Sequence, residues 1–406
     1  MKTMTGAARY ASVAFGLVVS TFAASAASTD TVCERIQPLE VSYRDFSPTQ
    51  VEIVQPCPPR DDRLPYVLFV SYVALVDKDY YSGENPDDAV TADRQSDIFL
   101  FAALARELNA KGFTAIKYDA IAVHAASATG GNGRTDIVSQ DELLRVERED
   151  FSGLLHSVIQ AADLALGTGG ERPVIFVAHS GGAFTVADYF ARFSQGRDGG
   201  RKLGFVGISP SVSADTGTKP SYRDYWIRSL QQCLQHNEKS VCWAQWNGDK
   251  QFVRMFNEGR RQRIAEIFAG STEETQLIGG LNAYLTTVAA EIDAENKASS
   301  EGVGYLNNKY QMRNELFNSM FFRQPSATPI SCRSNASRLI YGSGDFAMSG
   351  EVEREAWESA CGKPEQLVLL DGVGHCLGQD RYFGPIRQEA KAVVVDSILK
   401  VADELR

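Results

Sequence analysis

The chain has 406 residues, of which 44% are apolar, and a net charge of −10. That length suits one large domain with an insertion, or two domains. The acidic balance argues against nucleic acids and anionic lipid surfaces as partners. The five histidines are scattered and no Cys-x-x-Cys or His-Glu-x-x-His string occurs, so a metal site is not indicated.

The first 26 residues have the pattern of a secretory signal peptide. Lys2 and Arg9 give a basic start, residues 11–22 are apolar, and residues 24–26 (Ala-Ser-Ala) form a small-x-small cleavage site. The apolar stretch is too short to span a bilayer, so we expect no stable membrane anchor. We therefore expect a periplasmic or secreted protein, whose net charge becomes −12 because the peptide removes two basic and no acidic residues.

All seven cysteines follow the expected cleavage site, and export would place them in an oxidising compartment. Proximity along the chain suggests three disulfides, although six cysteines allow 15 pairings. The suggested pairs are Cys33 with Cys57, Cys233 with Cys242, and Cys332 with Cys361. Cys376 is left over next to His375, either as a free buried thiol or as half of a disulfide.

The first part of the mature chain alternates between predicted strands and helices. A polar, proline-bearing arm at residues 27–64 has room for one or two edge strands. Alternating strands and helices predict a doubly wound, mostly parallel sheet. The predicted elements are a strand and its exit at 66–76, a helix at 98–111 ending at Gly112, a strand at 113–123, a helix at 140–167, and strands at 174–178 and 203–209.

The alternation breaks between residues 221 and 323, where no convincing strand is visible and helical segments carry many aromatic residues. Strands return at 338–341 and 366–370, followed by a last helix at 385–405. We predict that residues 221–323 form a helical cap or lid inserted into an α/β core of residues 65–220 and 324–406. Aromatic side chains such as Trp243 and Trp246 would then line an apolar pocket. A separate helical domain with its own partner stays open as an alternative.

Residues 174–182 read Val-Ile-Phe-Val-Ala-His-Ser-Gly-Gly, an apolar run that stops at Ser180 and continues as an amphipathic helix. A serine at so sharp a strand-to-helix turn has a strained backbone and a projecting hydroxyl. The turn needs small residues two positions before and after, which here are Ala178 and Gly182. This pattern predicts a nucleophile elbow with Ser180 as nucleophile.

A serine nucleophile needs a base, and the base needs an orienting carboxylate. His375 lies in a glycine-rich loop just after the strand at 366–370, and Asp345 follows the strand at 338–341. Asp371 also follows a strand and competes with Asp345 for the role of orienting acid. His179 adjoins Ser180, but an elbow neighbour points away from the hydroxyl, so we do not expect it to be the base.

These motifs together resemble the α/β-hydrolase superfamily. Residues 178–182 resemble its Gly-His-Ser-x-Gly with alanine first, residues 341–345 its Gly-x-x-Asp turn, and residues 371–375 its Gly-x-Gly-His loop. The order Ser, Asp, His is also that of the superfamily. The resemblance implies an oxyanion hole built from the Gly181 N–H and a second donor after the first parallel strand. Where that family often has His-Gly, this chain has Tyr72 and Val73, so either backbone N–H or the Tyr72 hydroxyl would serve.

The resemblance implies acyl transfer to water without a cofactor. Serine at the elbow argues against dehalogenase and epoxide hydrolase activities, which use aspartate there in this superfamily. The expected function is an exported hydrolase of carboxylic esters, acting on a small-molecule or polymer ester. A peptidase or amidase of the same superfamily, or a non-catalytic binding protein on this scaffold, are the alternatives. The oligomeric state is left open.

Overall fold

The structure is a computed structural model, and it describes part of the chain. The expected signal peptide lies outside the described residues. The described residues are 34–43, 48–57, 64–71, 78–82, 92–119, 151–193, 200–210, 227, 230–231, 233–235, 238–248, 258–298, 303–305, 311–313, 336–345, 350–378 and 384–406.

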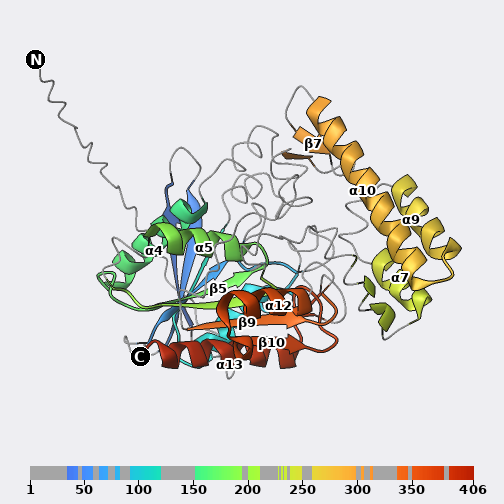
Figure 1. The fold of residues 1–406 in the computed structure, drawn as a ribbon. Helices are drawn as coiled ribbons and strands as arrows, with labels where there is room; N and C mark the ends of the chain where they lie inside the picture. Colours follow the sequence, from blue (N-terminus) through green and yellow to red (C-terminus); the bar gives the residue numbers. More distant parts are fainter. Residues whose placement is uncertain are drawn as a thin grey trace, which may run out of the picture. The chain divides into compact units, whose positions relative to one another are not determined.

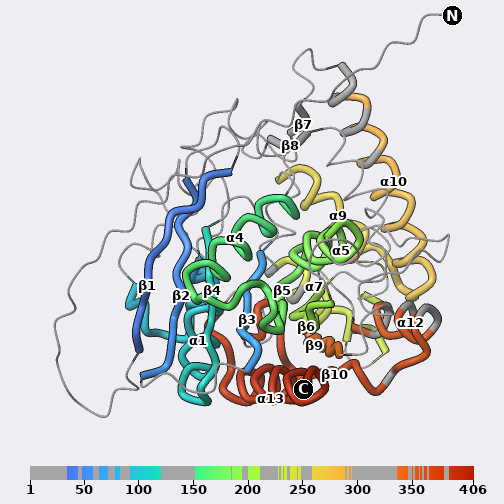
Figure 2. The backbone as a smooth tube through the Cα atoms, turned by 90° about the vertical axis from the view of Figure 1, so that its left-hand side faces the viewer, coloured from blue at the N-terminus to red at the C-terminus, as the bar shows by residue number. Residues whose placement is uncertain are grey.

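The core of the fold is an eight-stranded sheet with the order β1-β2-β4-β3-β5-β6-β9-β10. Neighbouring strands in the run β4-β3-β5-β6-β9-β10 pair in parallel, whereas β2 pairs antiparallel with both β1 and β4. Figure 2 follows the sheet from β1 and β2 in blue to β10 in red. The strands are β1 (Glu34–Val41), β2 (Thr49–Pro56), β3 (Tyr66–Val70), β4 (Ala115–Tyr118), β5 (Val174–His179), β6 (Leu203–Ile208), β9 (Ser337–Gly342) and β10 (Leu367–Leu370).

Helices cover both faces of this sheet, so the predicted doubly wound, mostly parallel architecture is confirmed. In β5, Phe176 and Ala178 pack in a core with α4, α5 and α12, whereas Ile175 and Val177 pack in a second core with α1 and α13. This alternation is the two-residue period of a strand buried on both faces. Figure 1 shows α4 and α5 on one side of the sheet and α13 on the other. The helices are α1 (Leu100–Ala110), α4 (Phe151–Leu166), α5 (Gly182–Phe193), α12 (Gly350–Cys361) and α13 (Gln388–Glu404).

The N-terminal arm supplies the two antiparallel strands that the sequence allowed for. β1 lies at the edge of the sheet and several of its side chains are exposed, whereas β2 is more buried because it pairs on both sides. Gly112 has a φ of +93°, the left-handed conformation expected after the last turn of α1. The last helix begins at Gln388 and not at Pro385, because Arg387 has an extended backbone.

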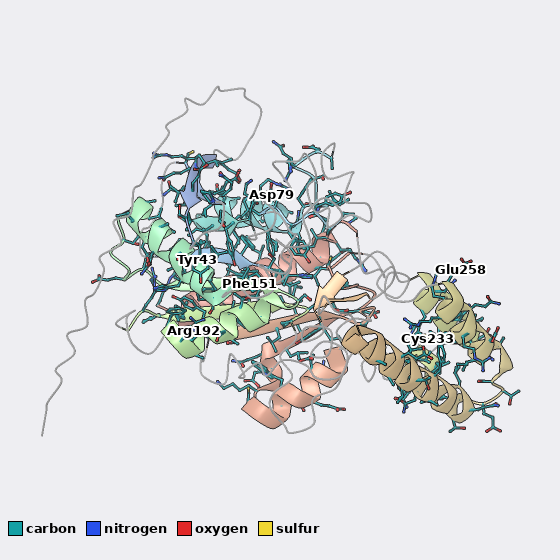
Figure 3. The ribbon with its side chains drawn as sticks, turned by 90° about the horizontal axis from the view of Figure 1, so that it is seen from above. Tyr43, Asp79, Phe151, Arg192, Cys233 and Glu258 are labelled. Atoms are coloured by element: carbon teal, nitrogen blue, oxygen red, sulfur yellow. A yellow bond between two sulfur atoms is a disulfide. The ribbon has the colours of Figure 1, made fainter. Side chains whose placement is uncertain are left out.

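Three helices of the region 221–323 share a core of their own, built from residues such as Trp246, Phe268 and Leu281. They are α7 (Lys239–Gly248), α9 (Glu258–Gly270) and α10 (Glu274–Ala298). The predicted disulfide between Cys233 and Cys242 is confirmed, and Figure 3 shows Cys233 among these helices. Cys57 and Cys361 are also disulfide-bonded, while their suggested partners Cys33 and Cys332 lie outside the described residues.

Two expectations for this region need correction. It contains a short antiparallel hairpin of β7 (Val303–Tyr305) and β8 (Gln311–Arg313), where no strand was predicted. Trp246 is 3% exposed and belongs to the internal core of the helices, while the half-buried Trp243 packs against that core with its ring 4.8 Å from the ring of Phe268. Burying Trp246 against neighbouring helices stabilises these helices and leaves little of its ring for a pocket wall. Among the helices in the described part of the chain, none combines the length and apolar character needed to cross a membrane.

Candidate active site

Ser180 lies at the end of β5, in a backbone conformation that few residues other than glycine adopt. Its φ is +52°, and its N–H donates to the carbonyl of Ile208 at 2.9 Å, which continues the pairing with β6. The conformation is costly for serine and marks a turn that the surroundings hold in place. Residues 174–179 and 181–183 are buried, whereas Ser180 is partly exposed. The elbow therefore presents this one residue at the C-terminal edge of the sheet.

Gly182 begins α5 and allows the end of β3 to approach the elbow. A Cβ atom at this position would lie 2.4 Å from the carbonyl oxygen of Val70, which is closer than any side chain can tolerate. The small residue expected two positions after Ser180 is thus explained by a direct backbone contact. The same contact places the start of the loop after β3 beside the elbow.

Asp345 and His375 lie on the two loops that follow β9 and β10, and the structure brings their side chains together. His375 Nδ1 and Asp345 Oδ2 are 2.8 Å apart, and both side chains are almost completely buried. The two loops pack closely: the Gly344 N–H donates to the Val373 carbonyl at 3.0 Å. At Gly342 a Cβ atom would lie 1.8 Å from that same carbonyl oxygen, so only glycine fits there.

The competing carboxylate, Asp371, has a different environment. It is exposed, and its Oδ1 accepts a hydrogen bond of 3.1 Å from the hydroxyl of Ser343. The same hydroxyl accepts the Gly372 N–H at 2.9 Å, so Asp371 belongs to the outer side of the turn that carries Asp345. The geometry favours Asp345 as the partner of His375.

His179 is buried between the backbone of His375 and the side chain of Tyr80. Its Nε2 lies 3.0 Å from the backbone carbonyl oxygen of His375, and its Nδ1 lies 2.6 Å from the hydroxyl of Tyr80. The rings of His179 and His375 meet edge to face at 4.7 Å. Burial, and the proximity of His375, hold the pKa of His179 well below its ordinary value of 6.5, so this histidine is neutral.

Cys376 is a free, buried thiol, which settles the alternative between a free thiol and a disulfide. Its side chain is hydrogen-bonded to the Tyr80 hydroxyl. Burial raises the pKa of the Cys376 thiol and of the Tyr80 phenol well above their ordinary values, so both groups keep their protons. The sequence singled out Cys376 only for its place next to His375, and nothing in it indicated Tyr80.

The expected oxyanion hole is described only in part. Gly181 follows Ser180 and is buried in the turn between β5 and α5, so its backbone N–H lies within the elbow. Tyr72 and Val73, expected to provide the second donor, lie outside the described residues. Ser71 is the last described residue before them, and its backbone lies within 3.3 Å of a Cβ built on Gly182.

No protein-family model and no curated protein sequence matches the chain. Solved structures with a similar backbone include a vibralactone cyclase. It has 10% sequence identity and a TM-score of 0.44, with 93% of this chain and 82% of that chain covered. A proline iminopeptidase from Mycobacterium smegmatis has 14% identity and a TM-score of 0.41 over 91% of this chain and 100% of that one. An esterase from Thermogutta terrifontis has 10% identity and a TM-score of 0.42 over 91% and 99%.

Similarity at this level carries no information about activity. The fold follows instead from the topology: an antiparallel β2 beside parallel strands in the order β4-β3-β5-β6-β9-β10, with helices on both faces. The elbow follows β5, and the loops of Asp345 and His375 follow β9 and β10. With this strand order and these three loop positions, the chain has the α/β-hydrolase fold.

Proposed function

We propose that the protein is an exported serine hydrolase that cleaves carboxylic esters. The observation that carries the proposal is the buried hydrogen bond between Asp345 and His375. The backbone carbonyl of His375 is in turn hydrogen-bonded to His179, the residue before Ser180. A carboxylate that accepts from Nδ1 leaves Nε2 of the imidazole unprotonated and able to take a proton. The Cys233–Cys242 disulfide and the pattern of residues 1–26 support export.

In the proposed mechanism, His375 takes the proton of Ser180 as the hydroxyl oxygen attacks the ester carbonyl. The Gly181 N–H stabilises the oxyanion, with a second donor from Tyr72 or Val73. Collapse of the tetrahedral intermediate, with His375 donating its proton to the leaving alcohol, gives an acyl-enzyme. His375 then activates water, which releases the acid and returns the proton to Ser180. Asp345 stabilises the imidazolium that forms in each half-reaction.

The test is Ser180→Ala, compared with the wild type and with Ser157→Ala. Ser157 is also partly exposed, but it lies in α4, where its hydroxyl bonds the Gly153 carbonyl within the helix. We expect Ser180→Ala to abolish labelling by a fluorophosphonate and to lower kcat on p-nitrophenyl esters by about 10³-fold or more, with the melting temperature nearly unchanged. Ser157→Ala should keep both activities.

A fall of only a few fold in Ser180→Ala would exclude Ser180 as the nucleophile. Wild-type protein that neither reacts with the fluorophosphonate nor hydrolyses any ester would favour the non-catalytic alternative. Faster cleavage of aminoacyl-nitroanilides than of p-nitrophenyl esters would show that the substrate is an amide and not an ester.

A further inference from the structure

A buried chain of polar side chains connects three separate segments around His375. It runs from Cys376 through the Tyr80 hydroxyl to His179, and from His179 to the backbone of His375. Tyr80 is 8% exposed, and the other three residues are each 1% exposed. At this depth an unpaired polar group is costly, so the direction of each hydrogen bond is constrained.

The proton positions follow from one fixed point. The carbonyl oxygen of His375 can only accept, so His179 Nε2 carries the proton and donates it. The neutral imidazole then has a lone pair on Nδ1, which accepts from the Tyr80 hydroxyl at 2.6 Å. The Tyr80 oxygen is left to accept from the Cys376 thiol. Each donor in this series of hydrogen bonds therefore has an acceptor. All the bonds point the same way, from the Cys376 thiol to the backbone carbonyl of His375.

Tyr80 is itself held firmly at the other end. It has a left-handed backbone with a φ of +56°, and its carbonyl accepts the Leu100 N–H at 2.9 Å. Its ring packs on Phe101 at 4.9 Å. The preceding residue, Asp79 (labelled in Figure 3), forms a buried ion pair with Lys117 of β4 and a second ion pair with Arg94, whose side chain is partly exposed. The phenol thus projects from a segment anchored to the start of α1 and to the sheet.

We propose that Tyr80 and His179 are positioning residues, which together fix the backbone of His375 relative to the elbow that carries Ser180. The Asp345 carboxylate orients the imidazole of His375, whereas His179 holds His375 by a hydrogen bond to the backbone carbonyl of His375. Because His179 is the residue before Ser180, one hydrogen bond joins the nucleophile's strand to the loop of the base. This role rests on the proposed function, in which His375 is the general base. A base displaced by about 1 Å can lose roughly 10²-fold in rate.

The kinetic test uses Tyr80→Phe with Tyr66→Phe as matched control. Tyr66 is also buried and also bonds a side chain, Asp163 at 3.3 Å, but it lies at the opposite end of β3 from the site. We expect Tyr80→Phe to lower kcat on a p-nitrophenyl ester, and the rate of fluorophosphonate labelling, by about 10- to 100-fold with KM unchanged. Tyr66→Phe should lower only the stability.

A rescue experiment separates positioning from mere packing. His179→Leu removes both hydrogen bonds and should lose at least as much rate as Tyr80→Phe. His179→Gln can accept from Tyr80 and donate to the carbonyl, so it should recover most of the lost rate. Wild-type rates in both Tyr80→Phe and His179→Leu, alongside a Ser180→Ala variant that is inactive, would overturn the positioning role while leaving the proposed function intact.

A third readout does not depend on activity. Nitrogen NMR of labelled wild-type protein should show His179 neutral, with the proton on Nε2 and a hydrogen-bonded Nδ1, at pH values below 6.5, its ordinary pKa. Tyr80→Phe should shift the Nδ1 resonance alone. Finding the proton on Nδ1, or a charged His179, would overturn the hydrogen-bond chain even if the protein proved to be an active hydrolase.

Discussion

Asp345 and Asp371 both follow a strand next to the histidine loop, but burial and hydrogen bonding separate them. Asp345 is buried and bonded to His375, whereas Asp371 is exposed and bonded to Ser343. A buried carboxylate at Nδ1 both selects the tautomer of the imidazole and stabilises its protonated form. An exposed carboxylate on the outer side of the turn does neither.

We therefore expect Asp345→Asn to lower kcat on a p-nitrophenyl ester by about 10³- to 10⁴-fold, because the amide can hold His375 in the wrong tautomer. Asp371→Asn should change the rate only slightly, since it alters one exposed hydrogen bond to Ser343. Steady-state kinetics on both purified variants provides the comparison, with melting temperatures as the check on folding. The opposite ranking would assign the orienting role to Asp371.

The residues of the site differ in how far the sequence reveals them. Ser180, Asp345 and His375 stand in short local patterns of small residues after apolar runs, and these patterns could be recognised directly. Tyr80 belongs to no such pattern: its partner His179 lies 99 residues away in the chain. The contact from His179 to the His375 carbonyl spans 196 residues. Contacts of this kind depend on the tertiary fold, so residue spacing could not indicate them.

At the scale of elements, the elbow depends on how closely β3, β5 and α5 approach one another. A Cβ at Gly182 meets the backbone carbonyl of Val70, which is part of a buried strand and cannot move aside as a flexible side chain would. A Cβ at Gly279, within α10, meets nothing within 4 Å. The two glycines are therefore present for different reasons.

Gly182→Ala should lower the free energy of unfolding by about 1–3 kcal/mol or more, because the elbow must shift to relieve the overlap. Gly279→Ala should raise it by about 0.5–1 kcal/mol, since alanine restricts the unfolded chain in a helix that has room for it. Urea unfolding of both variants measures the difference. Equal effects of the two substitutions would show that the contact between Gly182 and β3 does not determine the local packing.

The elements most visible in the sequence are the buried parallel strands. β5 and β6 are nearly continuous apolar runs bounded by turn residues, because both faces of the sheet are covered. The β7–β8 hairpin was not predicted because strands of three residues are too short to show an alternating pattern. Trp246 was misassigned for a related reason: an aromatic residue on a helix has the same sequence signature whether it faces a pocket or a neighbouring helix.

At the scale of the whole molecule, the helical region interrupts the chain between two neighbouring strands of the sheet. The insertion follows β6, which is hydrogen-bonded to β5, and it precedes β9, which pairs with the other side of β6. The chain thus enters the insertion from the C-terminal end of the strand next to Ser180. In open α/β sheets, ligands bind beyond the carboxyl ends of the strands. We propose on these grounds that residues 221–323 form the cap that selects substrates.

Two changes to the insertion test this proposal. In the first, a short linker replaces residues 221–323; in the second, Cys233→Ser and Cys242→Ser together remove the disulfide and leave the rest of the chain unchanged. The helices of the insertion share their own core, so loosening them should leave the sheet and its loops intact. We expect both variants to keep kcat on p-nitrophenyl acetate but to change the ratio of kcat/KM between long and short acyl chains, because Ser180, Asp345 and His375, the proposed catalytic residues, lie outside the insertion. The disulfide variant keeps the test decisive if the linker variant fails to fold. An unchanged ratio in a folded variant that has lost its helical core would show that the insertion does not select the substrate.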